Sequence, residues 1–95
     1  MFRLEDLTLF VRAAALNSFS DAAREVGVQP AQVSSAIKRL ESTLAIRLFA
    51  RSTRSLRLTP EGNRFFQRVE AAFGEIEDAA HELSPSQHRH LRIST

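Results

Sequence analysis

The stretch from Val26 to Glu41, VGVQPAQVSSAIKRLE, decides the fold of this 95-residue chain. Apolar residues recur through it at helical spacing, namely Val33, Ile37, Leu40 and, just beyond, Leu44. Pro30 does not interrupt this pattern, because the first amide of a helix has no helical partner and the proline φ already suits a helix. The sequence therefore predicts a helix from Pro30 to about Thr43, with Gln29 at its N-cap position.

A shorter helix is predicted just before this one. Ser20 is expected to cap it, with Asp21 in the positively polarised first turn, and Gly27 fits the left-handed residue that ends a helix. Contacts between the two helices are expected from Ala22, Ala23, Val26, Val28, Val33 and Ala36. Two helices joined by a glycine turn are typical of the DNA-binding helix-turn-helix. We predict such a unit over residues 19–38, with a purely structural helix pair as the alternative.

The outward face of the later helix carries short polar side chains, where an ordinary surface helix would more often carry Glu and Lys. At about 100° per residue, Ala31, Ser35, Lys38 and Ser42 point away from the apolar side, flanked by Gln32, Ser34 and Arg39. Glutamine can pair with adenine, serine can donate or accept, and alanine can contact a thymine methyl group. We expect base-edge contacts from Pro30, Ala31, Gln32, Ser34, Ser35 and Lys38, and DNA-backbone contacts from Ser20, Gln29 and Arg39.

Two further elements flank this unit in the first part of the chain. Apolar spacing predicts a first helix over about residues 4–16, from Leu4, Leu7, Phe10, Val11 and Ala14. In IRLFARSTRSLRLTPEG, residues 46–62, short apolar runs surround a basic turn, which predicts a two-stranded hairpin over residues 46–59. Its tip is expected to contact DNA through Arg51, Ser52, Thr53 and Arg54.

A long helix is predicted from about Pro60 to Leu83, with Thr59 as its cap and Gly62 tolerated in its first turn. Apolar or small residues recur at alternating steps of four and three, as in a heptad seam: Gly62, Phe66, Val69, Phe73, Ile76, Ala80 and Leu83. The seam either packs within its own domain or joins two subunits. We favour a dimer, because three Phe and one Ile exceed what so small a domain is expected to cover. The expected interface is Phe65, Phe66, Val69, Phe73, Ile76, Ala80 and Leu83.

Charge is segregated along the sequence although the chain as a whole carries only +2. Residues 38–68 hold eight Lys or Arg against two carboxylates, whereas residues 69–83 hold five carboxylates and no Lys or Arg. Such blocks indicate a face that binds a polyanion, or else an ordinary solvated surface. Composition alone names no function, since 43% apolar and 25% charged residues are ordinary for a globular chain.

Other functional classes find little support in the sequence. The chain has no cysteine, so a disulfide framework or a thiolate metal site is excluded. The three histidines, His81, His88 and His90, have no carboxylate or thiol partners at ligand spacing, and no catalytic constellation or glycine-rich phosphate loop is present. We expect no enzyme, no bound metal, no signal peptide and no membrane-spanning segment.

The stretch from Leu4 to about Leu83 resembles the LysR-type transcriptional regulators. The resemblance lies in the strings LTLFVRAA, SFSDAAREVGV, VSSAIKRLES and LAIRLFARSTRSLRLTPEG, followed by the long helix. It implies a winged helix-turn-helix in which the hairpin is the wing, with Arg54 in the minor groove and Arg51 on a phosphate. It further implies antiparallel pairing of two long helices, and an effector-binding domain whose first strand LRIST resembles.

Two positions depart from the family pattern. Ser35 stands where relatives very often carry Arg or Lys, and Gln32 stands where they usually carry a small residue. A serine cannot reach guanine or a phosphate as a long cation does, so the resemblance leaves the readout at that base open. Gln32 is expected to supply a different contact.

Together these observations predict a mainly α chain with three parts. Residues 1–59 form a winged helix-turn-helix of three helices and a two-stranded wing, residues 60–84 a linker and dimerisation helix, and residues 85–95 a hinge and the first strand of a further domain. The expected function is that of a cytoplasmic, dimeric, sequence-specific transcription regulator that binds an interrupted palindrome in double-stranded DNA. A nonspecific nucleoid-type protein and a protein-interaction module are the alternatives.

The expected partners follow from this function. They are double-stranded DNA, a second copy of the chain through the linker helix, a higher oligomer of the whole protein, and RNA polymerase. No cofactor is expected within these residues, and a small-molecule effector is expected to bind the domain that follows.

Overall fold

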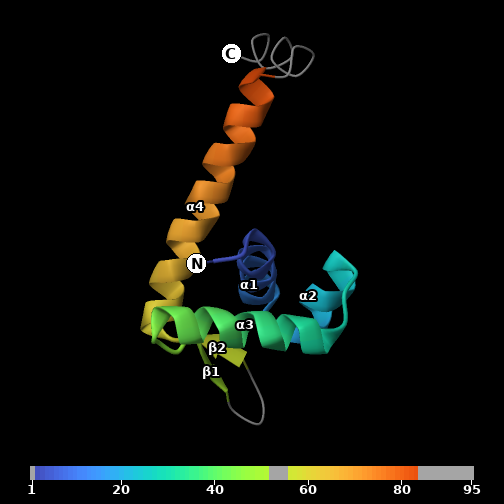
Figure 1. Ribbon diagram of the computed structural model, residues 1–95, viewed down its shortest axis with the longest axis vertical. Coiled ribbons are helices and arrows are strands. Elements are labelled where there is room, and N and C mark those ends of the chain that lie inside the picture. Colours follow the sequence, from blue (N-terminus) through green and yellow to red (C-terminus); the bar gives the residue numbers. More distant parts are fainter. Residues whose placement is uncertain (1, 52–55, 84–95) are drawn as a thin grey trace.

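The computed structural model describes residues 2–51 and 56–83 and confirms the predicted fold class (Figure 1). The elements follow one another as α1 (Leu4–Leu16), α2 (Phe19–Val26), α3 (Pro30–Leu44), β1 (Phe49–Arg51), β2 (Leu56–Leu58) and α4 (Pro60–Leu83). The first three helices pack on one another, and α4 runs away from them along the long axis of the molecule. Over the described residues, no helix combines the length and the apolar character that crossing a bilayer requires.

The start of α2 differs from the sequence prediction. Ser18, rather than Ser20, is the N-cap, and its hydroxyl accepts a hydrogen bond from the Asp21 amide at 3.0 Å. Beginning the helix two residues earlier lets the Phe19 ring pack edge-on against Phe49, at 5.5 Å between centroids. The prediction that Ser20 caps α2 is therefore wrong, because a tertiary contact selects the earlier serine.

The turn between α2 and α3 is held by the backbone. Gly27 has a φ of +89° and is the left-handed residue that the sequence predicts. The amides of Gly27 and Val28 both donate to the Ala23 carbonyl, at 2.8 and 2.9 Å. Ala22 and Ala23 are buried in the predicted contact, but Val26 is 39% exposed, so its predicted role between the helices is wrong. Val26 is the last residue of α2, where the chain already turns outward.

The inner face of α3 is the one that the apolar spacing predicts. Val33, Ala36, Ile37 and Leu40 are all buried, and the helix runs one residue further than expected, to Leu44. Near its end, one oxygen of the Glu41 carboxylate accepts hydrogen bonds from the Leu48 and Phe49 amides, at 2.8 and 3.4 Å. These bonds fix where the first strand of the hairpin leaves α3.

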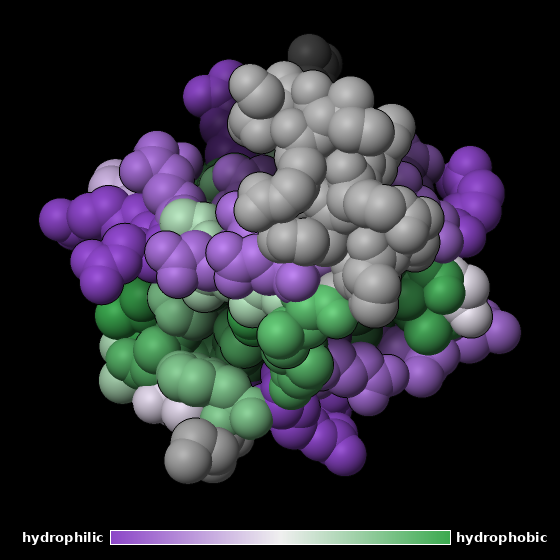
Figure 2. Space-filling view, turned by 90° about the horizontal axis from the view of Figure 1, so that it is seen from above, coloured by the Kyte–Doolittle hydropathy of each residue, from purple (hydrophilic) through white to green (hydrophobic). Residues whose placement is uncertain are grey.

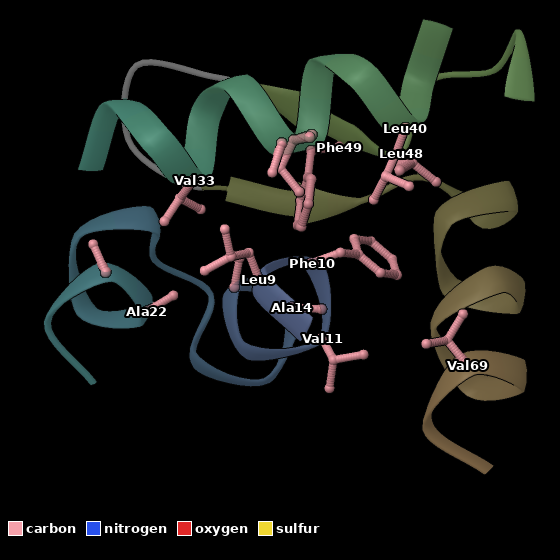
Figure 3. Packing of buried hydrophobic residues seen from close by; sticks show 14 residues of the cluster. Leu9, Phe10, Val11, Ala14, Ala22, Val33, Leu40, Leu48, Phe49 and Val69 are labelled. Atoms are coloured by element: carbon pink, nitrogen blue, oxygen red, sulfur yellow. The ribbon is translucent and has the colours of Figure 1, made fainter. Parts of the chain in front are cut away.

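The core lies where α1, α3, the hairpin and the beginning of α4 meet (Figure 3). Phe10 of α1 is fully buried at its centre. Its ring lies 5.8 Å from that of Phe49, 5.4 Å from Phe65 and 6.3 Å from Phe66, measured between centroids. The core of the helix-turn-helix therefore includes α4 and is not complete without it.

The junction between β2 and α4 is tightly built. The Thr59 hydroxyl accepts from the Gly62 amide at 2.9 Å, as the predicted cap should, and donates to the Arg47 carbonyl at 2.5 Å. A Cβ atom on Gly62 would lie 2.1 Å from the Leu48 carbonyl oxygen. From the sequence, Gly62 is expected only to be tolerated here, whereas this close approach requires glycine.

Candidate nucleic-acid interface

The outward face of α3 is solvent-exposed along its length. Exposed residues on it include Ala31, Gln32, Ser35, Lys38 and Ser42, while Ser34 is half-buried. Lys38 makes no hydrogen bond or ion pair within the part of the chain that the structure describes. The face therefore presents one available cation among short side chains, on a helix whose opposite side is anchored in the core. Such a face can approach a groove closely.

The beginning of α3 ties Gln32 to the backbone. Pro30 is its first residue and Gln29 its cap, as predicted. The backbone N–H of Gln29 donates to the side-chain Oε1 of Gln32 at 2.9 Å, and the backbone N–H of Gln32 donates to the backbone carbonyl of Gln29 at 2.9 Å. Gln32 thus helps to begin the helix. Its spacing from Gln29, three residues after the cap, is that of a capping box and is the sequence signal for this role.

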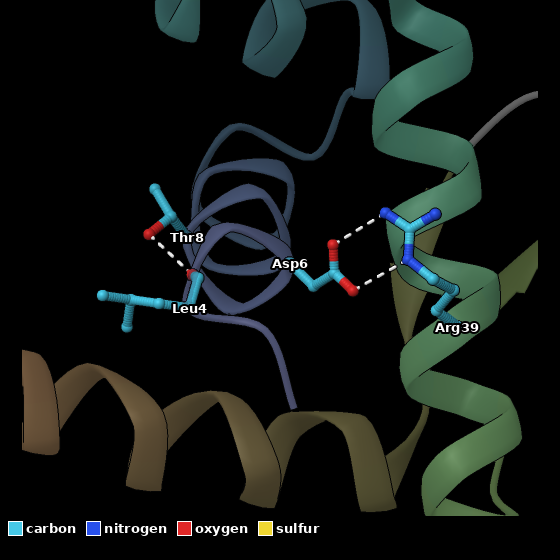
Figure 4. A network of polar contacts seen from close by, with 4 residues as sticks. All are labelled: Leu4, Asp6, Thr8 and Arg39. Atoms are coloured by element: carbon cyan, nitrogen blue, oxygen red, sulfur yellow. Dashed lines mark hydrogen bonds and ion pairs between the residues drawn. The ribbon is translucent and has the colours of Figure 1, made fainter. Parts of the chain in front are cut away.

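Arg39 is held by an ion pair that crosses from α3 to α1 (Figure 4). Its Nε and Nη2 atoms donate to the two carboxylate oxygens of Asp6, at 2.9 and 2.8 Å. The Asp6 side chain is only 3% exposed, whereas that of Arg39 is 47% exposed. The buried Asp6 carboxylate therefore orients the Arg39 guanidinium, and it compensates much of the Arg39 charge within the protein itself. Asp6 was not singled out from the sequence, because its partner lies 33 residues away.

This pair has a direction of pH dependence. The hydrogen bonds from Arg39 lower the pKa of Asp6 below its ordinary value, although burial acts in the opposite sense. A carboxylate with a lowered folded-state pKa stabilises the protein above its unfolded pKa, about 3.9, and loses that contribution as the pH falls through the lower folded value.

We expect Arg39→Gln to lower stability most at neutral pH, with the difference from the wild type shrinking below about pH 4. Urea unfolding between pH 3 and 7 would measure this difference. The matched control is Arg24→Gln, because Arg24 pairs with Asp21 only on the surface, with both side chains more than half exposed. A difference for Arg39→Gln that does not change with pH would contradict the role assigned to Asp6.

The hairpin lies beside α3, at the end of the molecule opposite the far end of α4 (Figure 1). Its strands are antiparallel, with Phe49 opposite Leu58 and Ala50 opposite Arg57. Arg57 is exposed on the return strand. The backbone of Arg51 ends β1, but its side chain and residues Ser52, Thr53 and Arg54 lie outside what the structure describes. Their DNA contacts remain predictions.

Charge is distributed along the long axis of the molecule, which extends 49 Å. Exposed cations gather at the α3, hairpin and early α4 end: Lys38, Arg39, Arg47, Arg57, Arg64 and Arg68. The far half of α4 exposes only carboxylates among its charged residues, from Glu70 to Glu82. A polyanion would therefore be attracted to the end that carries α3 and the hairpin.

The apolar seam of α4 is divided between two environments. Phe65, Phe66, Val69 and Phe73 pack against the core of their own chain. Ile76 and Leu83 are 60% and 85% exposed. Of the three Phe and one Ile that the sequence predicts to exceed the cover of their own domain, the three Phe are half-buried, with Phe65 and Phe66 against Phe10 of α1, and Ile76 stays exposed. Only the later part of the seam stays open.

A hollow lies between α1 and α4 beside this open part. It is lined by Leu4, Thr8, Val11, Phe73 and Ile76, together with the charged residues Arg12, Glu70 and Glu77. Leu4 is itself 64% exposed. Apolar surface is visible when the molecule is viewed from the α4 end (Figure 2). Within the described residues, no group of three or more His, Cys, Asp or Glu side chains is arranged to hold a metal ion.

Known proteins resemble this chain in both sequence and structure. Residues 4–63 match the model of the bacterial regulatory helix-turn-helix proteins of the lysR family. The HTH-type transcriptional regulator PerR of Escherichia coli is 35% identical over 94% of the chain, and CrgA of Neisseria meningitidis is 39% identical over 83%. The chain spans only 30% and 26% of these two relatives, respectively.

Solved structures agree with this assignment. The DNA-binding domain in the crystal structure of the BenM_DBD/catB site 1 DNA complex has a TM-score of 0.80, with 26% identity over 99% of this chain and 97% of that one. Full-length OxyR from Pseudomonas aeruginosa also gives a TM-score of 0.80, with 27% identity over 90% of this chain and 29% of that one. The chain therefore belongs to the LysR family of bacterial helix-turn-helix transcriptional regulators.

Proposed function

We propose that this chain is the DNA-binding part of a transcription regulator that recognises specific sequences in double-stranded DNA. The observation that carries the proposal is the exposed outer face of α3 on a helix-turn-helix whose structural relative, BenM, is solved with DNA. The helix would enter the major groove and present Pro30, Ala31, Gln32, Ser34, Ser35 and Lys38 to base edges. Ser20 and Gln29, near the start of the unit, would contact the DNA backbone.

The wing would contact the same duplex beside α3. Arg54 would enter the minor groove, where a cation reads groove width and potential rather than base identity. Arg51 would contact a phosphate, and Ser52 and Thr53 would complete the tip. Arg39 would contact the DNA backbone as a guanidinium oriented by Asp6, with its net charge reduced.

A competition experiment tests this function. Binding of the purified chain to a duplex selected from a random library is expected to resist excess random duplex and to weaken steeply with salt. Specific sites usually bind several orders of magnitude more tightly than random DNA, about 10³-fold or more. Equal affinity for all duplexes would favour the nucleoid-type alternative. If Arg51→Ala and Arg54→Ala bound DNA with unchanged affinity and unchanged salt dependence, the wing would not be part of the interface.

We also propose that two copies pair through α4. The open part of the seam supports this, because Ile76 and Leu83 are exposed in the single chain and Ala80 continues their row. Four other residues of the expected interface pack on the core of their own chain and would contribute mainly by supporting the residues at the contact: Phe65, Phe66, Val69 and Phe73. A symmetric pair would place two copies of α3 against an interrupted palindrome.

Ile76→Asp is expected to shift the chain from dimer to monomer while leaving its fold intact. Burying an unpaired carboxylate in an interface is costly, but at a site 60% exposed in the monomer the charge stays in water. Analytical ultracentrifugation would measure the dissociation constant, with an expected rise of about 100-fold or more. Glu75→Gln, a neighbouring exposed position, is the control. A dimer unaffected by Ile76→Asp would exclude this part of α4 from the interface.

The expectations for the whole protein remain proposals. We propose that a small-molecule effector binds a domain beyond these residues, that the whole protein forms a higher oligomer, and that RNA polymerase is a partner. We further propose that the chain has no enzymatic activity and works in the cytoplasm. The relatives PerR and CrgA are transcriptional regulators more than three times as long as the stretch that this chain matches, which leaves room in such proteins for a further domain.

A further inference from the structure

Gln32 presents its two amide atoms to different environments. Its Oε1 accepts the Gln29 amide proton at 2.9 Å. A backbone N–H can only donate, so the atom that meets it must be the oxygen, and the orientation of the side-chain amide is fixed. The Nε2 group makes no hydrogen bond to the described part of the chain. Gln32 therefore keeps a donor available while its acceptor is engaged.

The position of Gln32 brings this donor to the candidate interface. Gln32 is exposed and lines a hollow between α1 and α3 together with Ala31, Ser35 and Arg39. The first residues of a recognition helix are the ones that contact base edges. Ser35 is too short to extend as far, and Arg39 is held back by Asp6. The amide of Gln32 is thus the longest uncharged donor on this part of α3.

The helix cap discourages the usual pairing of glutamine with adenine. That pairing needs Oε1 to accept from the adenine N6 amino group while Nε2 donates to N7. Here one of the two lone pairs of Oε1 already accepts the Gln29 N–H, so pairing with adenine would make this oxygen accept two hydrogen bonds at once, in competition with the cap that begins α3. The purine N7 accepts a hydrogen bond in either purine, so discrimination depends on the group beside it: a donor is satisfied by the keto oxygen of guanine or thymine and is opposed by the amino group of adenine or cytosine.

We propose that Gln32 selects a keto base, guanine or thymine, at one position of the DNA site, by donating from Nε2 while Oε1 caps α3. The proposal rests on the proposed function, since it requires α3 to lie in the major groove. The opposite preference, for adenine, is what a glutamine without the capping bond would be expected to show.

Gln32→Glu is the variant that separates the two atoms. Its carboxylate can still accept the Gln29 amide proton, and a negative charge suits the first turn of a helix. It replaces the donor by an acceptor and adds one negative charge, so overall affinity for DNA is expected to fall while the base preference reports the exchanged atom. Sites selected from a random duplex library are expected to carry guanine or thymine at one position with the wild type, and cytosine or adenine there with Gln32→Glu. The preference at that position should change by about tenfold or more, and Gln32→Ala should leave it neutral.

A second measurement changes the DNA instead of the residue, with Gln32→Ala as the comparison. The selected keto base is replaced by an analogue that lacks the keto oxygen, 2-aminopurine for guanine or 5-methyl-2-pyrimidinone for thymine. Affinity should fall about fivefold to tenfold with the wild type and stay unchanged with Gln32→Ala. Circular dichroism melting would establish that each variant is folded.

The outcomes are distinct. A wild-type site with adenine at the position that Gln32→Ala relaxes would overturn the proposal while leaving sequence-specific binding in place. Identical site profiles for the wild type and a folded Gln32→Glu would also overturn it. Enrichment of no sequence at all by the wild type would instead remove the proposed function on which the proposal rests.

Discussion

Phe10→Ala is expected to lower the free energy of unfolding by about 4 kcal/mol, the largest effect of any single substitution considered for this chain. Phe10 is fully buried, and its ring meets those of Phe49, Phe65 and Phe66. Removing the ring opens a cavity where α1, the hairpin and α4 meet. The surrounding side chains belong to three different elements and can fill that cavity only in part. Urea unfolding followed by circular dichroism would measure the change.

Phe2→Ala is the matched control for this prediction. Phe2 also contacts Phe65, at 6.2 Å between ring centroids, but it is 39% exposed. Its loss is expected to cost about 1 kcal/mol or less, because a half-exposed ring transfers less surface from water. If both substitutions lowered the free energy of unfolding by a similar amount, Phe10 would not hold α1, the hairpin and α4 together as its burial indicates.

Gly62→Ala is expected to cost about 3 kcal/mol, near the upper end for overpacking, although it adds one methyl group to a helix. The added Cβ would meet the Leu48 carbonyl oxygen at 2.1 Å. That oxygen also accepts the Thr59 amide at 2.9 Å, so it cannot move away without breaking a bond at the start of α4. Thermal or urea unfolding would report the loss.

The same helix supplies the control for Gly62. Gly74 lies in the middle of α4, and a Cβ placed there meets nothing within 4 Å. Gly74→Ala is therefore expected to stabilise the chain slightly, by about 0.5–1 kcal/mol, since alanine is the better helix former. A stabilising or neutral Gly62→Ala would show that α4 can shift away from the hairpin, contrary to the close packing described above.

Local sequence features predicted most of the fold because the corresponding physics is local. Pro30 can begin a helix, Gly27 can adopt a positive φ, and Thr59 can cap the helix after it, each for reasons that need no distant partner. The apolar spacing of α3 predicted its buried face for the same reason. These features are confirmed.

The features that the sequence did not reveal depend on contacts between distant residues. Ser18 caps α2 instead of Ser20 because Phe19 packs on Phe49. Gly62 is required because α4 passes close to Leu48. The sequence does not show that Phe65 and Phe66 are covered, because the ring that covers them, Phe10, lies more than 50 residues earlier in the chain.

The candidate interface was predictable to the level of a helix face and no further. Periodicity identified which residues of α3 point outward, and these are exposed or half-buried as expected. It did not reveal that Asp6 holds Arg39, or that the Gln32 oxygen is used within the protein. Both facts change which charges and hydrogen-bond acceptors remain for DNA, and both arise from the folded arrangement.

The turn at Gly27 has a consequence for how such a protein diversifies. Two amides of the main chain, those of Gly27 and Val28, close this turn on one carbonyl, so its angle does not depend on side chains of the outer face. Side chains on the outer face of α3 can therefore be exchanged over evolutionary time while the scaffold keeps its shape. A single architecture can in this way carry many different outer faces.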